Sequence, residues 1–282
     1  MGIVLAITNQ KGGVGKTTTS INLAASLAAT NRKVLLIDLD PQGNATTGSG
    51  IDKSDLAYSI YDVLVDGVTV SESIREAPAS GYDLLAANVD LTAAEMEMID
   101  LNRREYRLND ALKPIKDRYD YIIMDCPPSL SLLTINGLVA ADAAIIPMQC
   151  EYFALEGLTA LMTTIDRITG NLNPELEIEG IIRTMYDPRS SLTRDVSSQL
   201  VEHFGNKVYR TLIPRNVRLA EAPSFGLPIL YYDKQSRGAK AYLALAGEIN
   251  RRYELKGLVK RQPENDSLVK DSLVNKKNGV EQ

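Results

Sequence analysis

The chain has 282 residues, of which 44% are apolar and 24% charged, enough to bury the core of one large α/β domain. No run approaches the roughly 18 uncharged apolar residues of a transmembrane helix, and strand-like sequence follows Met1 directly, so we expect a cytoplasmic protein without a signal peptide. Two cysteines, Cys126 and Cys150, and one histidine, His203, exclude a disulfide framework, a C-x-x-C metal site and a histidine-based triad.

Charge is distributed unevenly along the chain. The formal net charge is −5, which argues against a polyanionic partner for the chain as a whole. Residues 183–261, however, hold 15 Lys and Arg against 7 Asp and Glu. A basic C-terminal third is therefore the part to examine for binding to nucleic acid.

Strand-like apolar runs alternate with helix-length amphipathic stretches. The strands are expected at 3–8, 33–39, 119–125, 143–148, 178–184 and 208–213. The helices are expected at 17–30, 92–117 (broken), 131–141, 154–170, 192–205 and 237–254. Continuous apolar strands are covered on both faces, which predicts an α/β fold with a doubly wound, mainly parallel twisted sheet and helices on both faces.

Two segments depart from this alternation. Residues 41–81 are punctuated by glycines and predict loops and short helices rather than a separate domain. The segment 258–282 is polar and charged, and predicts a disordered tail, with a short partner-binding or surface helix as the alternative. The expected organisation is thus one domain over 1–257 and a tail.

A phosphate-binding loop follows the first predicted strand. Its glycines can turn backbone N–H groups inward as an anion nest, and the next helix adds its positive N-terminus. A lysine reaches the β- and γ-phosphates of a nucleoside triphosphate, and a threonine hydroxyl ligates Mg²⁺. The expected nucleotide-binding residues are Lys11, Gly12, Gly13, Val14, Gly15, Lys16, Thr17 and Thr18. The usual first glycine of such loops is replaced by Gln10, and Lys11 is an extra cation.

Carboxylates follow two other predicted strands. Asp38 and Asp40 lie two residues apart, on one face of an extended chain, and repel each other unless a cation is near. Asp125 ends the run YIIMD, and Pro127 and Pro128 stop the strand there. An apolar strand ending in aspartate beside a phosphate loop predicts a Walker B carboxylate that holds Mg²⁺ directly or through water.

These motifs together resemble the ParA/Soj-type chromosome partitioning ATPases of the deviant Walker A P-loop family. The resemblance rests on KGGVGKTT (11–18), DLDPQGN (38–44), DCPPSL (125–130), QCEYFALEG (149–157) and IPRNVRLAEAPSFG (213–226). It extends from Ile3 to about Tyr253 and implies a slow, Mg²⁺-dependent ATP hydrolase. ATP and Mg²⁺ are the implied cofactors.

The resemblance also implies roles for single residues. Lys11 reaches across a homodimer that sandwiches two ATP molecules, and acts with Lys16 and Asp40 in catalysis, with Asp40 positioning the attacking water. Thr17, Asp38 and Asp125 resemble the magnesium-site groups. Three further residues are implied at the adenine: Pro214, Asn216 and, as a weaker candidate, Met185.

The same resemblance implies that the basic C-terminal third binds DNA. Relatives that lack an added reader domain bind double-stranded DNA non-specifically as ATP dimers, through phosphate contacts that carry no sequence information. The candidate DNA-binding residues are Arg189, Arg218, Lys234, Arg237, Lys240, Arg251 and Arg252. The alternative is that these residues are ordinary solvated surface charges with no binding role.

The resemblance implies a cytoplasmic, nucleoid-associated switch in chromosome or plasmid segregation, stimulated by DNA and by a ParB/Spo0J-type protein, with replication-initiation control as a further role in some members. A MinD-like membrane-associated division-site ATPase is the alternative, and it needs a basic amphipathic C-terminal helix that the tail does not supply. An iron–sulfur carrier is disfavoured because this chain lacks the cysteine pairs that would hold a cluster. A non-enzymatic nucleotide-binding scaffold is disfavoured by Asp40.

Overall fold

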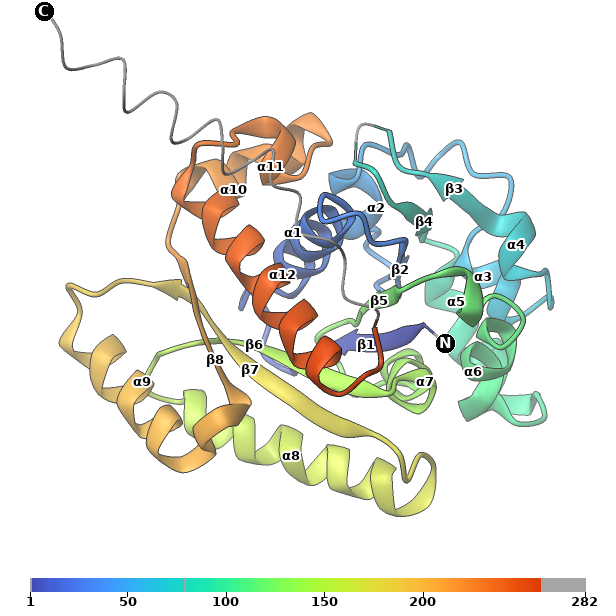
Figure 1. The fold of residues 1–282 in the computed structure, drawn as a ribbon. Helices are drawn as coiled ribbons and strands as arrows, with labels where there is room; N and C mark the ends of the chain where they lie inside the picture. Colours follow the sequence, from blue (N-terminus) through green and yellow to red (C-terminus); the bar gives the residue numbers. More distant parts are fainter. Residues whose placement is uncertain (1, 79, 260–282) are drawn as a thin grey trace, which may run out of the picture.

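The computed structural model describes residues 2–78 and 80–259. Eight strands form one sheet in the order β3-β4-β2-β5-β1-β6-β7-β8 (Figure 1). Every neighbouring pair is parallel except β3 and β4, which are antiparallel. The strands are β1 (Ile3–Ile7), β2 (Val34–Asp38), β3 (Ile74–Glu76), β4 (Asp83–Leu85), β5 (Tyr121–Asp125), β6 (Ala143–Gln149), β7 (Glu177–Tyr186) and β8 (Val208–Pro214).

Helices occupy the connections. The longer ones are α1 (Lys16–Ala28), α7 (Leu132–Ala140), α8 (Ala154–Asn171), α9 (Ser191–Phe204) and α12 (Arg237–Leu255). The shorter ones are α2 (Asn44–Gly48), α3 (Ile60–Leu64), α4 (Val70–Ser73), α5 (Leu91–Glu97), α6 (Arg107–Leu112), α10 (Val217–Glu221) and α11 (Ile229–Tyr232). Single 3₁₀ turns are η1 (Met98–Asp100), η2 (Arg104–Tyr106), η3 (Lys116–Arg118), η4 (Gly205–Lys207) and η5 (Ala222–Phe225).

The alternation of side chains along each central strand builds two cores. In β1, Val4 and Ala6 join one buried cluster with residues of α3 and α5 to α9, whereas Leu5 and Ile7 join a second cluster with residues of α1, α11 and α12. Because both faces of β1 are buried, its sequence is apolar without alternation. The predicted doubly wound α/β fold is confirmed.

Residues 41–117, between the second and third expected strands, fold only in part as the sequence predicts. The broken helix at 92–117 is found as α5, η1, η2 and α6. Residues 74–76, expected as a loop or short helix, instead form β3, and β4 was also missed. Both strands are only three residues long, too short for a periodic pattern. The predicted tail lies outside the described residues except for Leu258 and Val259.

In the described part of the chain, none of the helices has the length and apolar character needed to cross a bilayer.

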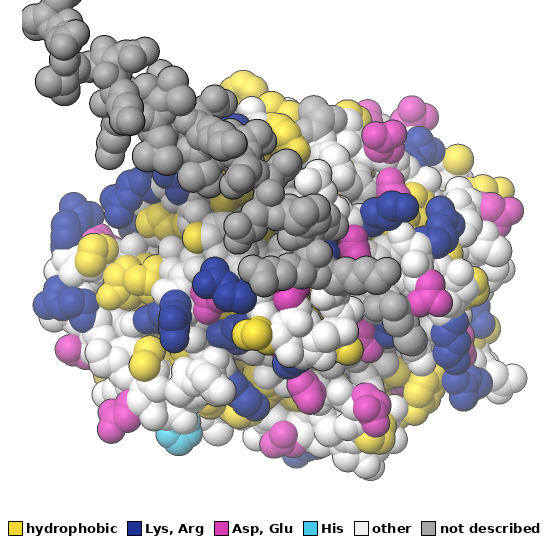
Figure 2. All heavy atoms as spheres, viewed as in Figure 1, with side chains coloured by type: hydrophobic (Ala, Val, Ile, Leu, Met, Phe, Trp, Pro, Cys, Tyr) yellow, Lys and Arg dark blue, Asp and Glu magenta, His cyan; other side chains and the backbone are white. Residues whose placement is uncertain are grey.

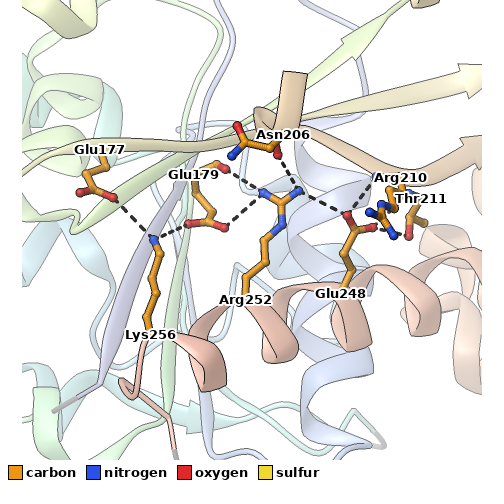
Figure 3. A network of polar contacts seen from close by, with 8 residues as sticks. All are labelled: Glu177, Glu179, Asn206, Arg210, Thr211, Glu248, Arg252 and Lys256. Carbon is orange, nitrogen blue, oxygen red and sulfur yellow. Dashed lines mark hydrogen bonds and ion pairs between the residues drawn. The ribbon is translucent and has the colours of Figure 1, made fainter. Parts of the chain in front are cut away.

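Strand β8 is one edge of the sheet, and its pairing with β7 is irregular between Val208 and Leu212. Glu248 of α12 accepts hydrogen bonds from the backbone N–H groups of Arg210 (2.9 Å) and Thr211 (3.0 Å). Figure 3 shows these contacts as part of a larger network. This carboxylate therefore satisfies two backbone donors in the irregular stretch of β8 and fixes α12 to it.

Arg252 is the centre of that network. Its guanidinium contacts the carboxylates of Glu179 (3.5 Å) and Glu248 (3.3 Å) (Figure 3). It also lies 4.1 Å from the centre of the Tyr209 ring. The Glu179 side chain is only 3% exposed. A buried carboxylate is tolerated when it is paired, so Arg252 and Lys256, 3.3 Å away, are what allow Glu179 to be there.

Replacing Arg252 with leucine should lower the free energy of unfolding by about 3 kcal/mol, because it removes one of the two cations that pair with the buried carboxylate of Glu179. Urea unfolding of the nucleotide-free protein measures this. Arg251→Leu is the matched control, since Arg251 is exposed on the same turn of α12, and should change stability by less than about 0.5 kcal/mol. Equal effects of the two variants would contradict the role given to Arg252.

Candidate active site

The phosphate-binding loop connects β1 to α1 at the carboxyl edge of the sheet. Gly13 and Gly15 have φ angles of +73° and +88°, in the left-handed region where a Cβ is disfavoured. Gly15 precedes the first residue of α1, which has no side-chain cap and no acidic residue in its first turn. Its first N–H groups are thus left for another acceptor, and a phosphate is a suitable one.

Lys16 is drawn into the hollow of this loop. Its side-chain ammonium donates to the carbonyl of Lys11 (3.2 Å), and the residue is 7% exposed. Burial lowers the pKa of Lys16, while the carboxylates of Asp125 and Asp40 act in the opposite direction. The loop therefore already surrounds a cation whose charge is only partly compensated, as a phosphate-binding lysine requires.

Asp38 and Asp125 lie side by side at the ends of neighbouring strands. They are paired in register across β2 and β5, and both are fully buried. Burial is the main cause that raises the pKa of each carboxyl, and their mutual repulsion adds to the rise for Asp125. Two buried carboxylates at adjacent strand ends need a nearby cation or strong hydrogen bonds to stay ionised.

The protein satisfies the two carboxylates unequally. Asp38 accepts from the backbone N–H (2.8 Å) and hydroxyl (2.8 Å) of Thr46 and from the Asp40 N–H (3.1 Å). Asp125 accepts from the Ser20 hydroxyl at one oxygen (2.8 Å), but its other oxygen, Oδ2, is buried without a hydrogen bond. The unsatisfied oxygen is on Asp125, whereas the hydrogen bonds of Asp38 also hold the chain from 40 to 46. The predicted place of Asp38 at the magnesium site stays a prediction.

This donor set fits Mg²⁺. Across 2–78 and 80–259, no cluster of three His, Cys, Asp or Glu side chains that could hold a metal is found. Mg²⁺ is commonly held by one or two carboxylates together with phosphate oxygens and water. The orphaned Asp125 Oδ2 and the hydroxyl of Thr17, which lowers the pKa of Asp125, are the protein groups that would hold it here.

Asp40 lies at the rim of the same cluster. It is partly buried, and its Oδ1 accepts from the Gln42 N–H (3.0 Å). No hydrogen bond to its Oδ2 is found among the described residues. A carboxylate with one fixed and one free oxygen, close enough to influence Lys16, is suited to hold a water molecule near a bound phosphate.

The side chain of Lys11 points away from the phosphate site that Lys16 enters. Its ammonium pairs with the carboxylate of Glu151 (2.5 Å), in the loop between β6 and α8, and its side chain is 45% exposed. The structure therefore separates the two lysines of the loop: one enters the phosphate site, and the other lies at the molecular surface.

The end of β7 supports the loop through two residues, one of them missed by the sequence analysis. The Thr184 hydroxyl donates to the carbonyl of Val14 (2.8 Å). Met185, at a φ of +48°, lies against Gly15, where an added Cβ would be 3.8 Å from its Cε. The one sequence signal that could have pointed to Thr184 is its position at the end of a predicted strand.

The predicted adenine residues gather near this strand end. Pro214 is paired in register with Tyr186 across β7 and β8. Asn216 caps α10, accepting from the Arg218 N–H (2.9 Å). Contact of Met185, Pro214 and Asn216 with adenine stays a prediction.

The candidate DNA-binding residues differ in their surroundings. Arg189 pairs with Asp187 (2.7 Å), and Arg218 with Glu221 (2.9 Å), both at exposed positions. Four others are exposed: Lys234, Arg237, Lys240 and Arg251. The guanidinium of Arg252 is engaged in the network of Figure 3, so its DNA contact is the least supported of the seven predictions.

A groove of about 1080 Å³ between β8 and α12 adds cations that the sequence analysis did not select. Lys207 and Arg210 line it together with Arg251. Figure 2 shows several Lys and Arg side chains over the region where α9, β8 and α12 lie in Figure 1. This face has the charge expected of a surface that meets a polyanion.

Comparison with known proteins gives consistent matches over most of the chain. A family model described as an AAA domain matches residues 2–178. An uncharacterized protein of Pseudomonas putida is 65% identical over 252 residues, 89% of this chain and 96% of that protein. The sporulation initiation inhibitor protein Soj of Bacillus subtilis is 53% identical over 249 residues, 88% of this chain and 98% of Soj. The chromosome partitioning protein ParA of Caulobacter vibrioides is 53% identical over 248 residues, 87% of this chain and 93% of that protein.

Solved structures share the fold. Cobyrinic acid a,c-diamide synthase of Mycobacterium smegmatis, with bound ADP and magnesium, superposes with a TM-score of 0.79 at 38% identity, covering 90% of this chain and 96% of that one. The cell division ATPase MinD of Pyrococcus furiosus gives a TM-score of 0.74 at 27% identity, covering 89% of this chain and 99% of that one.

Asp125→Asn should stabilise the protein in the absence of nucleotide and Mg²⁺. The folded-state pKa of Asp125 is raised, so folding stability falls as pH rises above the ordinary aspartate value of about 3.9 and through the raised pKa. The variant escapes this loss, and urea unfolding should show it more stable by about 2 kcal/mol at pH 8, with the gain shrinking towards pH 4.

The exposed Asp55 provides the control for this experiment. Asp55→Asn should change the free energy of unfolding by less than about 0.5 kcal/mol at either pH. A pH-independent effect of Asp125→Asn, or a loss of stability at pH 8, would contradict the electrostatic account of the site.

Proposed function

The chain belongs to the ParA/Soj family of chromosome partitioning ATPases, and on this premise we propose that it is an ATP-dependent dimeric switch that binds DNA non-specifically during chromosome or plasmid segregation. The observation that carries the proposal is the division of labour between the two lysines. Lys16 is buried in the phosphate loop, whereas the side chain of Lys11 lies outside it, at the surface.

We infer that the loop binds ATP with Mg²⁺. The backbone N–H groups of the loop and the N-terminus of α1 hold the phosphates, and the Lys16 ammonium neutralises their charge. When bound, Mg²⁺ compensates the negative charge at the β- and γ-phosphates, with Asp125 and Thr17 as its protein partners. Cobyrinic acid a,c-diamide synthase, which was solved with ADP and magnesium and with an ATP analog and magnesium, supports this ligand set.

Hydrolysis then depends on Asp40 and on Lys11. Asp40 holds the attacking water through its free oxygen, in line with the γ-phosphate. Charge that develops on the transferred phosphoryl group needs a further cation. Lys11 supplies it from the partner subunit, so that full catalysis requires two subunits with two ATP molecules between them, and a single subunit hydrolyses slowly.

DNA binding and stimulation follow from dimerisation in this proposal. Two copies of the basic face, brought together by ATP, bind phosphates of double-stranded DNA more tightly than one copy can. A ParB/Spo0J-type partner stimulates hydrolysis and thereby releases the dimer. The protein is then cytoplasmic and nucleoid-associated, with residues 1–257 as the ATPase domain.

A MinD-like membrane-associated ATPase is the second candidate. The shared fold with MinD of Pyrococcus furiosus favours it, but at 27% identity, compared with 53% for Soj and ParA. The segment that would grip a membrane belongs to the predicted tail, most of which lies outside the described residues.

Asp40→Ala tests the dimeric switch. Loss of the water-holding carboxylate should reduce hydrolysis by about 100-fold or more while leaving ATP binding intact, so the ATP-bound dimer should accumulate. Size-exclusion chromatography with light scattering, with ATP and with ADP, measures the molar mass. A monomer with ATP would exclude the sandwich dimer.

Gly12→Val is the matched contrast for this experiment. A Cβ at Gly12 meets nothing within 4 Å in a single subunit, so the variant should fold. At an interface between two loops the valine would collide with the partner, and Asp40→Ala with Gly12→Val should remain monomeric. A normal dimer of this double variant would place the interface elsewhere.

Arg189→Glu with Arg218→Glu tests the DNA surface in the Asp40→Ala background. Each lost phosphate contact should weaken affinity and reduce the slope of log affinity against log salt by about 1. Fluorescence anisotropy with unrelated duplexes between 50 and 200 mM salt measures this, and all sequences should be affected alike.

Lys113→Glu is the control for charge reversal, since Lys113 is 64% exposed on a part of the chain without predicted contacts. It should leave the salt slope unchanged. DNA binding that survives the reversal of Arg189 and Arg218 would move the DNA site to another surface.

A further inference from the structure

The motif QCEYFALEG (149–157) has no task in the catalysis described above, yet it touches the phosphate loop. Strand β6 ends at Gln149 and α8 begins at Ala154. Between them, the carboxylate of Glu151 accepts a hydrogen bond from the ammonium of Lys11 at 2.5 Å. Glu151 is thus the residue that determines where Lys11 points in a single subunit.

The backbone of Lys11 is fixed, so only its side chain is free to choose another partner. Its N–H donates to Asn9 Oδ1 (3.0 Å), and its carbonyl accepts from the Lys16 ammonium (3.2 Å). Asn9 in turn donates to the carbonyl of Pro147 in β6 (2.8 Å). The loop and the end of β6 are therefore one framework, from which Lys11 and Glu151 project together.

The pair itself is weak enough to open. The side chains of Lys11 and Glu151 are 45% and 52% exposed, so water and salt screen their attraction. A triphosphate presents several negative charges and more acceptor oxygens than one carboxylate. Lys11 can therefore leave Glu151 when such a group comes within reach.

We propose that Glu151 is a positioning residue that holds Lys11 on its own subunit until the ATP of a second subunit takes it. The proposal rests on the dimeric function given above. Because the ion pair exists in the free subunit and opens in the dimer, Glu151 competes with the partner's triphosphate and weakens ATP-dependent dimerisation. Each dimer opens two such pairs, so the effect enters twice.

Glu151→Gln tests the competition in the Asp40→Ala background, where ATP is not consumed. An exposed ion pair changes an equilibrium by a factor of about 1.5 to 5, so opening two should make removal of the charge tighten the ATP-bound dimer by about 2- to 25-fold. Sedimentation velocity across a dilution series measures the dimer dissociation constant. Glu156→Gln, an exposed glutamate in the first turn of α8, is the matched control and should leave it unchanged.

The outcomes separate this proposal from the one it rests on. If the Asp40→Ala parent does not dimerise with ATP, the dimeric function fails. If the parent dimerises and Glu151→Gln leaves the dissociation constant unchanged or raises it, the dimeric function survives, and Glu151 merely anchors the loop between β6 and α8.

A second measurement tests the pair without any dimer. In the nucleotide-free monomer, limited acetylation read by mass spectrometry should modify Lys11 faster in Glu151→Gln than in the parent, because the ammonium is no longer held by a carboxylate. Lys33, exposed just before β2 and so at the opposite end of the strands from the phosphate loop, serves as the internal reference within each sample. Equal acetylation rates at Lys11 in the two proteins would overturn the proposal.

Discussion

Two buried carboxylates placed side by side determine how this site is built. Asp38 and Asp125 end neighbouring parallel strands in register, where burial and mutual repulsion both oppose their ionisation. The chain from 40 to 46 folds back to satisfy Asp38, and Ser20 of α1 satisfies one oxygen of Asp125. The other oxygen of Asp125 is buried without a hydrogen bond, so a bound cation would stabilise the folded protein by pairing with it.

Strand β7 connects this site to the basic face. At its carboxyl end, Thr184 and Met185 contact the phosphate loop. One residue earlier, Arg183 donates to Ser197 of α9 (2.8 Å) and to the Tyr209 carbonyl of β8 (2.7 Å). Adjacent residues of β7 thus contact the glycine-rich loop on one side and the elements that line the basic groove on the other, so the loop and the groove share one packed element.

The sequence predicted the parts of the molecule whose reasons are local. The glycine-rich loop, the carboxylates at strand ends and the long apolar strands follow from glycine conformation, charge and burial, and they lie at the expected positions in the fold, whereas binding of phosphate and Mg²⁺ there stays a prediction. Strands β3 and β4 were missed because three residues carry no periodicity, and their pairing is a tertiary effect. Thr184 and Glu151 were missed as site residues because their partners, Val14 and Lys11, are more than 130 positions away in the chain.

Supply of Lys11 by the partner subunit is the central claim, and a mixing experiment tests it most directly. Lys11→Ala and Asp40→Ala chains should each hydrolyse ATP poorly alone. In a mixed dimer, the site that keeps Asp40 receives Lys11 from the other chain, so an equimolar mixture should recover up to about a quarter of the wild-type rate in a two-fold dimer. If Lys11 acted within its own subunit, neither site would be complete, and a mixture as inactive as its components would contradict the account.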